Sequence, residues 1–371
     1  MKRFWSFVLV AMIGFVGCSQ NPPDEPSAPE ASEDGGSDAV VTTGDLPAFS
    51  ITASEYPSWS TFMVAAKAGL INPDQGGDYG PLEIKYGVDV VLQVKDYDPC
   101  LTMFANGACD ATCMTNMDAL NPALGRASTA ICPTSQSLGA DKVIAVGFKS
   151  VQDLKGQKVY GLAKSVSEYL FVRGLEQQGE NPTDYEFANL DPGAAATALQ
   201  TGSSDVKAID VWNPFALQTL RTAKGSTTIF DSTVIPGEIV DMIVIGNDSL
   251  AKEGGTNFAT CLCDIFYQVS KNLNSSDSAV ADATLTALGE DFSNLPLADM
   301  RIVIKETQFY ATPQDGTSLY TSDQFKETMK TVVSTCQKIG VLEDKTPTIG
   351  YGDASAQLNF DPQYMEAVSG N

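Results

Sequence analysis

Short apolar segments alternate with amphipathic ones along most of the chain, and this alternation limits the fold more than any other feature. We expect strands at residues 88–94, 110–115, 142–147, 158–163, 185–189, 206–212, 227–231 and 239–246. Helices are expected at 58–68, 165–179, 192–202, 258–273 and 322–340, and Asp98-Pro99 suits the start of another that ends at Gly107. Such alternation is typical of doubly wound α/β layers.

Ligands of such folds bind outside the carboxyl ends of the strands, so the loops that follow strands are where a site is expected. Six loops meet this condition: 56–59, 115–118, 135–141, 165–169, 212–214 and 232–241.

The first residues read as an export signal. Lys2 and Arg3 precede an apolar run, 4–16, that is too short to span a bilayer. The run ends in Gly17-Cys18, which resembles the lipobox of bacterial lipoproteins, although Phe15 replaces the usual leucine. This implies a signal peptide over 1–17, lipidation of Cys18, and a membrane-anchored protein facing the periplasm or the cell exterior. The alternative is an ordinary secretory signal that is cut elsewhere.

Residues 18–46 are expected to form a tether. Carboxylates alternate there with Pro, Ser and Gly, and from residue 21 to 45 there is no Lys or Arg. A segment of this kind cannot bury enough apolar surface to offset its chain entropy. The globular body is therefore expected to begin near Pro47.

Composition narrows the function. The formal net charge of −23 argues against nucleic acid as a partner. Histidine is absent, which excludes Ser-His-Asp and Cys-His catalysis and histidine-ligated metal sites. No cofactor, metal site or catalytic residue is expected. Besides Cys18 there are seven cysteines, an odd number that favours some disulfides and at least one free thiol, although buried inert thiols would explain most of them.

Four segments in these loops carry a resemblance to a known family. They are Thr115-Asn-Met-Asp-Ala-Leu120, Ser165-Val-Ser-Glu-Tyr-Leu170, Val211-Trp-Asn-Pro214 and the segment 230–241 with Pro-Gly-Glu-Ile-Val-Asp. With them, the body resembles substrate-binding proteins of nitrate/sulfonate/taurine-type ABC transporters, and more narrowly the branch associated with urea carboxylase, described as binding urea or guanidine. The fold also resembles thiamine-pyrimidine synthases, but these depend on histidine and iron.

The resemblance implies a two-lobed α/β periplasmic binding protein, type II-like, with a ligand cleft between the lobes. One lobe would comprise 47–140 and 240–371, and the other 141–239. It further implies a small-molecule ligand, an ABC permease and ATPase as partners, and no enzymatic activity.

Candidate ligand residues follow from the loops. Glu238 and Asp241 are three residues apart and so fall on opposite faces of a strand; Glu238 is expected to point into the cleft, and Asp241 to be a hinge or solvated residue. Asp118 is a second candidate ligand. It lies near a helix N-terminus, where the helix dipole favours a carboxylate whether or not a ligand binds, so a purely structural role is the alternative. The resemblance adds Asn116. Ser165 and Ser167 precede or begin a helix, so one is expected to cap it while the other, with Glu168, faces the cleft.

Trp59 and Trp212 lie at loop positions, where they could form a stacking wall for a cation, with buried core positions as the alternative. Asn213 is restrained by the following proline. Carboxylates beside tryptophan favour guanidinium as the ligand, whereas neutral urea would leave the negative charge of buried carboxylates uncompensated. Nitrate or sulfonates would need Arg or Lys in these loops, and only Lys164 is close. A histidine-free hydrolase and a non-transporting sensor lipoprotein remain the other classes.

Overall fold

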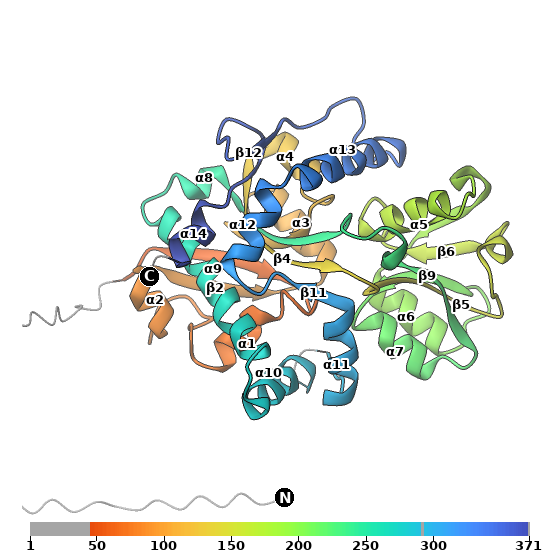
Figure 1. Cartoon of the computed structure of the whole chain (residues 1–371), viewed down its shortest axis with the longest axis horizontal. Helices are drawn as coiled ribbons and strands as arrows, with labels where there is room; N and C mark the ends of the chain where they lie inside the picture. Colours follow the sequence, from red (N-terminus) through yellow and green to blue (C-terminus); the bar gives the residue numbers. More distant parts are fainter. Residues whose placement is uncertain (1–44, 291–292, 370–371) are drawn as a thin grey trace, which may run out of the picture. The chain divides into compact units, whose positions relative to one another are not determined.

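The computed structural model describes residues 45–290 and 293–369. The expected signal peptide, Cys18 and nearly all of the acidic tether thus lie outside the described residues. Two sheets organise the body, with helices packed around them (Figure 1). Within the described part of the chain, no helix is long and apolar enough to cross a membrane.

The larger sheet has the strand order β12-β13-β4-β10-β3-β1-β2, and β11 pairs with β4. Its strands are β1 (Ala48–Ala53), β2 (Asp89–Val94), β3 (Ala111–Thr115), β4 (Ser128–Ser137), β10 (Val240–Gly246), β11 (Thr307–Phe309), β12 (Ile349–Tyr351) and β13 (Leu358–Phe360). β1 is parallel to both β2 and β3, while β10 runs antiparallel between β3 and β4. The carboxyl ends of β1, β2 and β3 therefore meet at one edge.

The smaller sheet has the order β7-β6-β8-β5-β9 and is drawn in yellow to green in Figure 1. Its strands are β5 (Asp141–Val146), β6 (Lys158–Gly161), β7 (Glu186–Asn189), β8 (Ala208–Trp212) and β9 (Ser226–Asp231). β6 is parallel to β7 and β8, and β5 is antiparallel to β8 and β9. All its strands come from one continuous stretch of chain.

Helices cover both sheets. They are α1 (Thr61–Lys67), α2 (Pro81–Tyr86), α3 (Tyr97–Ala105), α4 (Leu120–Gly125), α5 (Val166–Gln177), α6 (Pro192–Gln200), α7 (Phe215–Thr222), α8 (Asn247–Leu250), α9 (Gly255–Leu273), α10 (Ser278–Glu290), α11 (Leu297–Glu306), α12 (Pro313–Thr321), α13 (Asp323–Lys338) and α14 (Gln363–Ser369). Short 3-10 turns lie at Val151–Leu154, Pro182–Asp184 and Ser232–Val234. The mixed α/β class expected from the alternation is confirmed.

The ten-residue strand β4 has no counterpart among the expected elements. Its sequence, STAICPTSQS, is polar and contains Pro133, which cannot donate a ladder hydrogen bond. The structure tolerates this proline because the register with β10 shifts beside it, between the pairs of Asp241 and Met242. A central strand of this composition carries no alternating pattern to reveal it.

Two smaller expectations were wrong. The N-cap of α3 is Asp96, and Asp98 lies in its first turn. The seven cysteines of the described residues are all free and buried, so none of the favoured disulfides is present there.

Candidate functional site

Three side chains project from the edge where β1, β2 and β3 end. Tyr56 follows β1, Tyr97 follows β2 as the first residue of α3, and Asp118 follows β3. Because these strands are parallel neighbours, residues far apart in the sequence are brought to one place. Asp241 joins them from β10, where it lies opposite Thr115 of β3 and Ser135 of β4.

The smaller sheet contributes a second pair. Asp141 begins β5 and is the direct cross-strand partner of Trp212, the last residue of β8. Both are buried, at 3% exposure each. The same carboxyl edge carries the loop that follows β6 and leads into α5 at Ser165.

Four aromatic rings form a continuous series, which we call the aromatic wall: Tyr56, Trp59, Tyr97 and Trp212. The Trp59 ring is stacked on Tyr97 with centroids 5.1 Å apart and planes 22° apart. Tyr97 meets Trp212 edge to face at 5.4 Å, and Tyr56 lies 4.8 Å from Trp59. Trp212 is the last residue of a strand in the smaller sheet, whereas Tyr56, Trp59 and Tyr97 follow strands of the larger sheet. The aromatic wall therefore joins the two sheets.

Asp118 lies against this wall. Its Oδ2 accepts hydrogen bonds from the Tyr97 hydroxyl at 2.7 Å and from Thr115 Oγ1 at 2.8 Å. Burial raises the pKa of Asp118 to about 6, against the lowering effect of these two donors and of the backbone amide of Val166. Val166 begins α5, so this carboxylate also contacts the smaller sheet's side of the site.

Asp141 and Asp241 are the carboxyls that act together with Asp118. We call these three residues, Asp118, Asp141 and Asp241, the carboxylate cluster. Burial raises the pKa of Asp141 to about 6, with Asp118 adding to the rise. The pKa of Asp241 is raised well above its usual value by burial first, and then by the charges of Asp141 and Asp118. Ser135 Oγ donates to Asp241 at 2.5 Å. The three carboxyls are thus close enough to oppose each other's ionisation.

Among the described residues, no basic side chain forms an ion pair with this cluster. Lys142 is adjacent in sequence to Asp141, but its ammonium group contacts the carbonyl of Gly139 and pairs with Glu306 at 2.9 Å. Nor, in the part of the chain that the structure describes, do His, Cys, Asp or Glu side chains gather closely enough to hold a metal ion.

The aromatic wall keeps polar atoms that lack partners. The indole Nε1 atoms of Trp59 and Trp212 are buried without a hydrogen bond to the described residues. The Tyr56 hydroxyl lies near Asp241, whose charge contributes to raising the tyrosine's pKa. Leaving such buried donors unpaired is costly.

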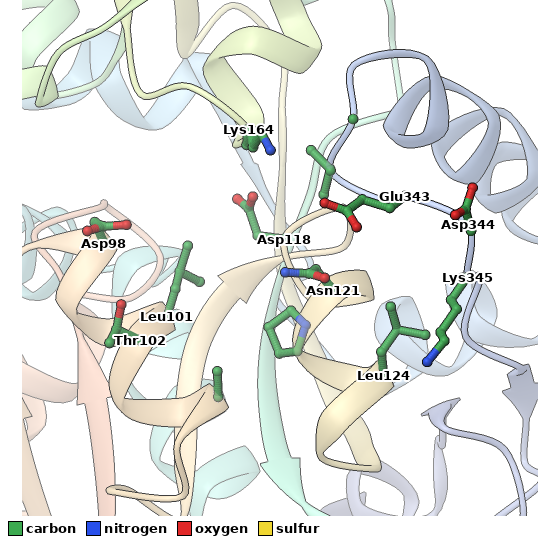
Figure 2. Close-up of a pocket in the computed structure, with 14 residues that line it drawn as sticks. Asp98, Leu101, Thr102, Asp118, Asn121, Leu124, Lys164, Glu343, Asp344 and Lys345 are labelled. Atoms are coloured by element: carbon green, nitrogen blue, oxygen red, sulfur yellow. The ribbon is translucent and has the colours of Figure 1, made fainter.

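A cavity of about 530 Å³ opens beside Asp118, the one member of the cluster among its lining residues. Figure 2 shows Asp118 and Lys164 reaching into it from different elements, with Asp98 and Glu343 on either side. Asp118 is thus shared between this cavity and the aromatic wall. The cavity's charged lining residues are Asp98, Asp118, Lys164, Glu343, Asp344 and Lys345, which gives it an excess of negative charge.

Glu238, the first choice from the sequence, has an internal partner. Its carboxylate accepts from Arg173 Nε at 2.9 Å, from Arg173 Nη2 at 2.8 Å and from the Tyr169 hydroxyl at 2.6 Å. A guanidinium of the protein already fills the position expected for a ligand. Asp241 is not the solvated or hinge residue expected from the strand pattern, because it is a buried member of the central strand β10.

The two candidate asparagines are engaged in the protein's own contacts. Asn116 Nδ2 donates to the carbonyl of Glu238 at 3.0 Å, and its Oδ1 accepts from the amide of Val240 at 3.1 Å. Asn213 donates to Glu306 at 2.8 Å and accepts from the amide of Leu217. Both side chains fix the backbone around the site.

The helix α5 begins as the serines suggested. The Ser165 hydroxyl accepts from the amide of Ser167, so Ser165 is the cap. Glu168 accepts from the backbone amide of Lys164 at 2.7 Å, which stabilises the left-handed conformation of that residue (φ 57°). Ser167 is buried with its hydroxyl unpaired.

The structure therefore groups Trp59, Asp118, Trp212 and Asp241 from the sequence-derived set, and adds Tyr56, Tyr97 and Asp141. Tyr56 and Asp141 lie within two of the six loops singled out above, so their position after a strand was a usable signal. Tyr97 lies in none of these loops, and only its contacts in the folded structure, the stacking on Trp59 and the hydrogen bond to Asp118, reveal it.

Comparisons with known proteins agree with this architecture. Residues 144–260 match the family model described as NMT1/THI5 like. An Escherichia coli (strain K12) protein described as aliphatic sulfonates-binding is 41% identical over 68 residues, which span 18% of this chain and 21% of that protein. The chain thus covers about a fifth of this curated relative's length.

Two solved structures are similar over most of their length. The alkanesulfonate-binding protein SsuA from Xanthomonas axonopodis pv. citri, bound to MOPS, superimposes with a TM-score of 0.64 at 16% identity, covering 82% of this chain and 96% of that one. The periplasmic aliphatic sulphonate binding protein SsuA from Escherichia coli gives 0.59 at 18% identity, covering 79% and 86%. The chain has the periplasmic binding protein fold.

Proposed function

We propose that this protein is the solute-binding component of an ABC importer and that its ligand is a small nitrogen-rich cation, with guanidine as the first candidate. The receptor role is supported by the fold and by the partial matches to sulfonate-binding proteins. A permease and an ATPase would then be its partners. Attachment to the membrane through Cys18 remains part of the proposal and rests on the leader residues alone.

One observation carries the choice of ligand: three buried carboxyls from different elements lie beside an aromatic wall, and Asp118 and Asp141 both raise the pKa of Asp241. Guanidinium donates hydrogen bonds in its plane, where carboxylates accept them in pairs, and its face stacks on aromatic rings. Both requirements are met by the carboxylate cluster and the aromatic wall together.

The same cluster argues against the ligands of the similar proteins. A sulfonate is an anion, and every carboxylate that is ionised among Asp118, Asp141 and Asp241 would repel it. The nearest buried cation, Lys142, is already paired with Glu306. Urea is neutral and could be held by these groups only if they kept their protons, since an amide does not compensate a buried carboxylate.

Calorimetric titration of the full chain with guanidinium, urea, taurine, methanesulfonate and nitrate tests the proposal. We expect saturable binding of guanidinium without turnover, weaker or no binding of urea, and none of the anions. Ammonium at equal concentration controls for nonspecific charge effects, because it lacks the planar shape. Tight sulfonate binding with no guanidinium binding would overturn the choice of ligand, and ligand hydrolysis would overturn the receptor role.

A further inference from the structure

We propose that the carboxylate cluster exchanges protons for its ligand, so that cation binding releases about one proton and weakens steeply in mildly acidic solution. This inference rests on the proposed function, because it requires a cationic ligand. It concerns a property that the similar proteins, as binders of sulfonates, give no reason to expect.

Asp118 is faced by neutral donors and by other acids. The Tyr97 and Thr115 hydroxyls donate to it, the amide of Val166 lies at the start of α5, and Asp98 is the nearest additional charge. Cys336 of α13 also lies near it and is held neutral by a pKa raised to about 12. Lys164 lines the same cavity as Asp118, and burial nonetheless raises the pKa of this carboxyl to about 6.

Asp141 is faced by Ser137, by the ring of its strand partner Trp212, and by Asp118. Lys142 lowers its pKa, but this effect comes third, after burial and the hydrogen bond from Ser137. The Lys142 ammonium is bound to Glu306 instead. Burial therefore prevails, and the Asp141 carboxyl is half protonated near pH 6.

Asp241 is surrounded by hydroxyls and acids. Ser135 and Tyr56 are its polar neighbours, and Asp141 and Asp118 its charged ones. Two further groups that face it are neutral because their own pKa values are raised: Tyr310 and Cys113. Burial and these like charges hold the pKa of its carboxyl well above the usual value.

Three like charges in one buried site cannot all form without a counter-ion. The empty cluster must hold protons, and their loss is shared among the three groups instead of belonging to one. A bound cation supplies the missing positive charge and lowers the pKa of each carboxyl. The net charge of the cluster then stays nearly constant if roughly one proton leaves for each cation bound.

Asp210 provides a matched contrast. It is fully buried in β8, two residues before Trp212, and both carboxyl oxygens lack a hydrogen-bond partner among the described residues. Its pKa is raised well above its usual value by burial and then by Asp141. Ionisation of Asp141 on ligand binding would raise it further, so Asp210 stays protonated in both states. An amide in its place should leave proton release unchanged.

The test is titration calorimetry of the full chain with guanidinium chloride at pH 6 in two buffers with different ionisation enthalpies. The difference in observed heat gives the number of protons exchanged. We expect release of about one proton, an affinity that falls roughly tenfold per pH unit below pH 6, and a flatter profile above it. Asp141→Asn should lower the number released at pH 6, whereas Asp210→Asn should not.

The outcomes separate this inference from the proposed function. Guanidinium binding with no proton exchange and no pH dependence in the wild-type protein would overturn the inference and leave the proposed function standing. Failure of guanidinium to bind at any pH, with urea or a sulfonate bound instead, would overturn both. Equal loss of proton release in the Asp210 and Asp141 variants would show that the proton comes from outside the carboxylate cluster.

Discussion

Arg173 holds Glu238 through two hydrogen bonds, from Nε at 2.9 Å and from Nη2 at 2.8 Å. The pair joins α5 to the segment that enters β10, and it continues through Glu176 to Lys338 of α13. The resulting series of charges, Lys338–Glu176–Arg173–Glu238, links a helix beside the smaller sheet to one that follows β11. A carboxylate that looks like a ligand residue in the sequence is thus part of the scaffold.

Glu238→Gln should therefore act mainly on stability. Loss of the carboxylate leaves a half-buried guanidinium with a weaker acceptor, and we expect the free energy of unfolding to fall by about 1–3 kcal/mol. Guanidinium affinity should change by only a few-fold. Urea-induced unfolding and calorimetry check the two effects. Unchanged stability together with abolished binding would place Glu238 at the ligand.

Asp241→Asn should weaken guanidinium binding strongly, because it removes one partner of a buried charge-paired contact. Such a loss costs about 2–5 kcal/mol, or about 30- to several-thousand-fold in affinity. The matched control is Asp74→Asn, an exposed aspartate in the loop before α2, which should bind as the wild type does. Full affinity in the Asp241 variant would remove this residue from the site.

Trp212→Leu should weaken cation binding by about 1–2 kcal/mol, the typical value of a desolvated cation–π contact. The control is Phe187→Leu, which removes a ring that packs against Phe171 in the smaller sheet. Both variants lose aromatic packing, so a comparable loss of stability is expected from each. Thermal unfolding with and without guanidinium separates the two effects, and equal ligand-induced shifts in both variants would contradict a stacking role for Trp212.

The unliganded protein should gain stability from the carboxylate cluster as the pH falls from about 7 towards 4. Asp118 and Asp141 have folded-state pKa values of about 6, raised from 3.8, so the folded state binds more protons than the unfolded state in this window. The free energy of unfolding contributed by each group then decreases as pH rises, by at most about 2–3 kcal/mol.

The double variant Asp118→Asn/Asp141→Asn isolates this contribution from all other acids. Its free energy of unfolding, measured in urea at pH 5 and pH 7.5, should exceed that of the wild type at pH 7.5 and approach it at pH 5. A constant difference between the two proteins across this range would show that these carboxyls titrate normally.

The site was partly predictable because strand ends are a local property. Asp118 and Trp212 lie where the apolar runs that form β3 and β8 end, and Trp59 and Asp241 lie in two more of the loops singled out from the sequence, 56–59 and 232–241. β4 was not found, because a polar strand that contains Pro133 has no alternating pattern. Its place between β10 and β13 is set by pairing partners that lie far away in the sequence.

By itself, the sequence determined the mixed α/β class and the loops that border the site, since both follow from the spacing of apolar residues along the chain. Only the tertiary structure decided which acid received an internal counter-ion. Arg173 and Glu238 are 65 positions apart, and nothing local distinguishes Glu238 from Asp241 as the paired residue. Packing between distant segments decides which acid receives a counter-ion. The helix α5 brings the guanidinium of Arg173 to Glu238, while the ends of β3, β5 and β10 bring together three carboxyls that have no ion-pair partner among the described residues.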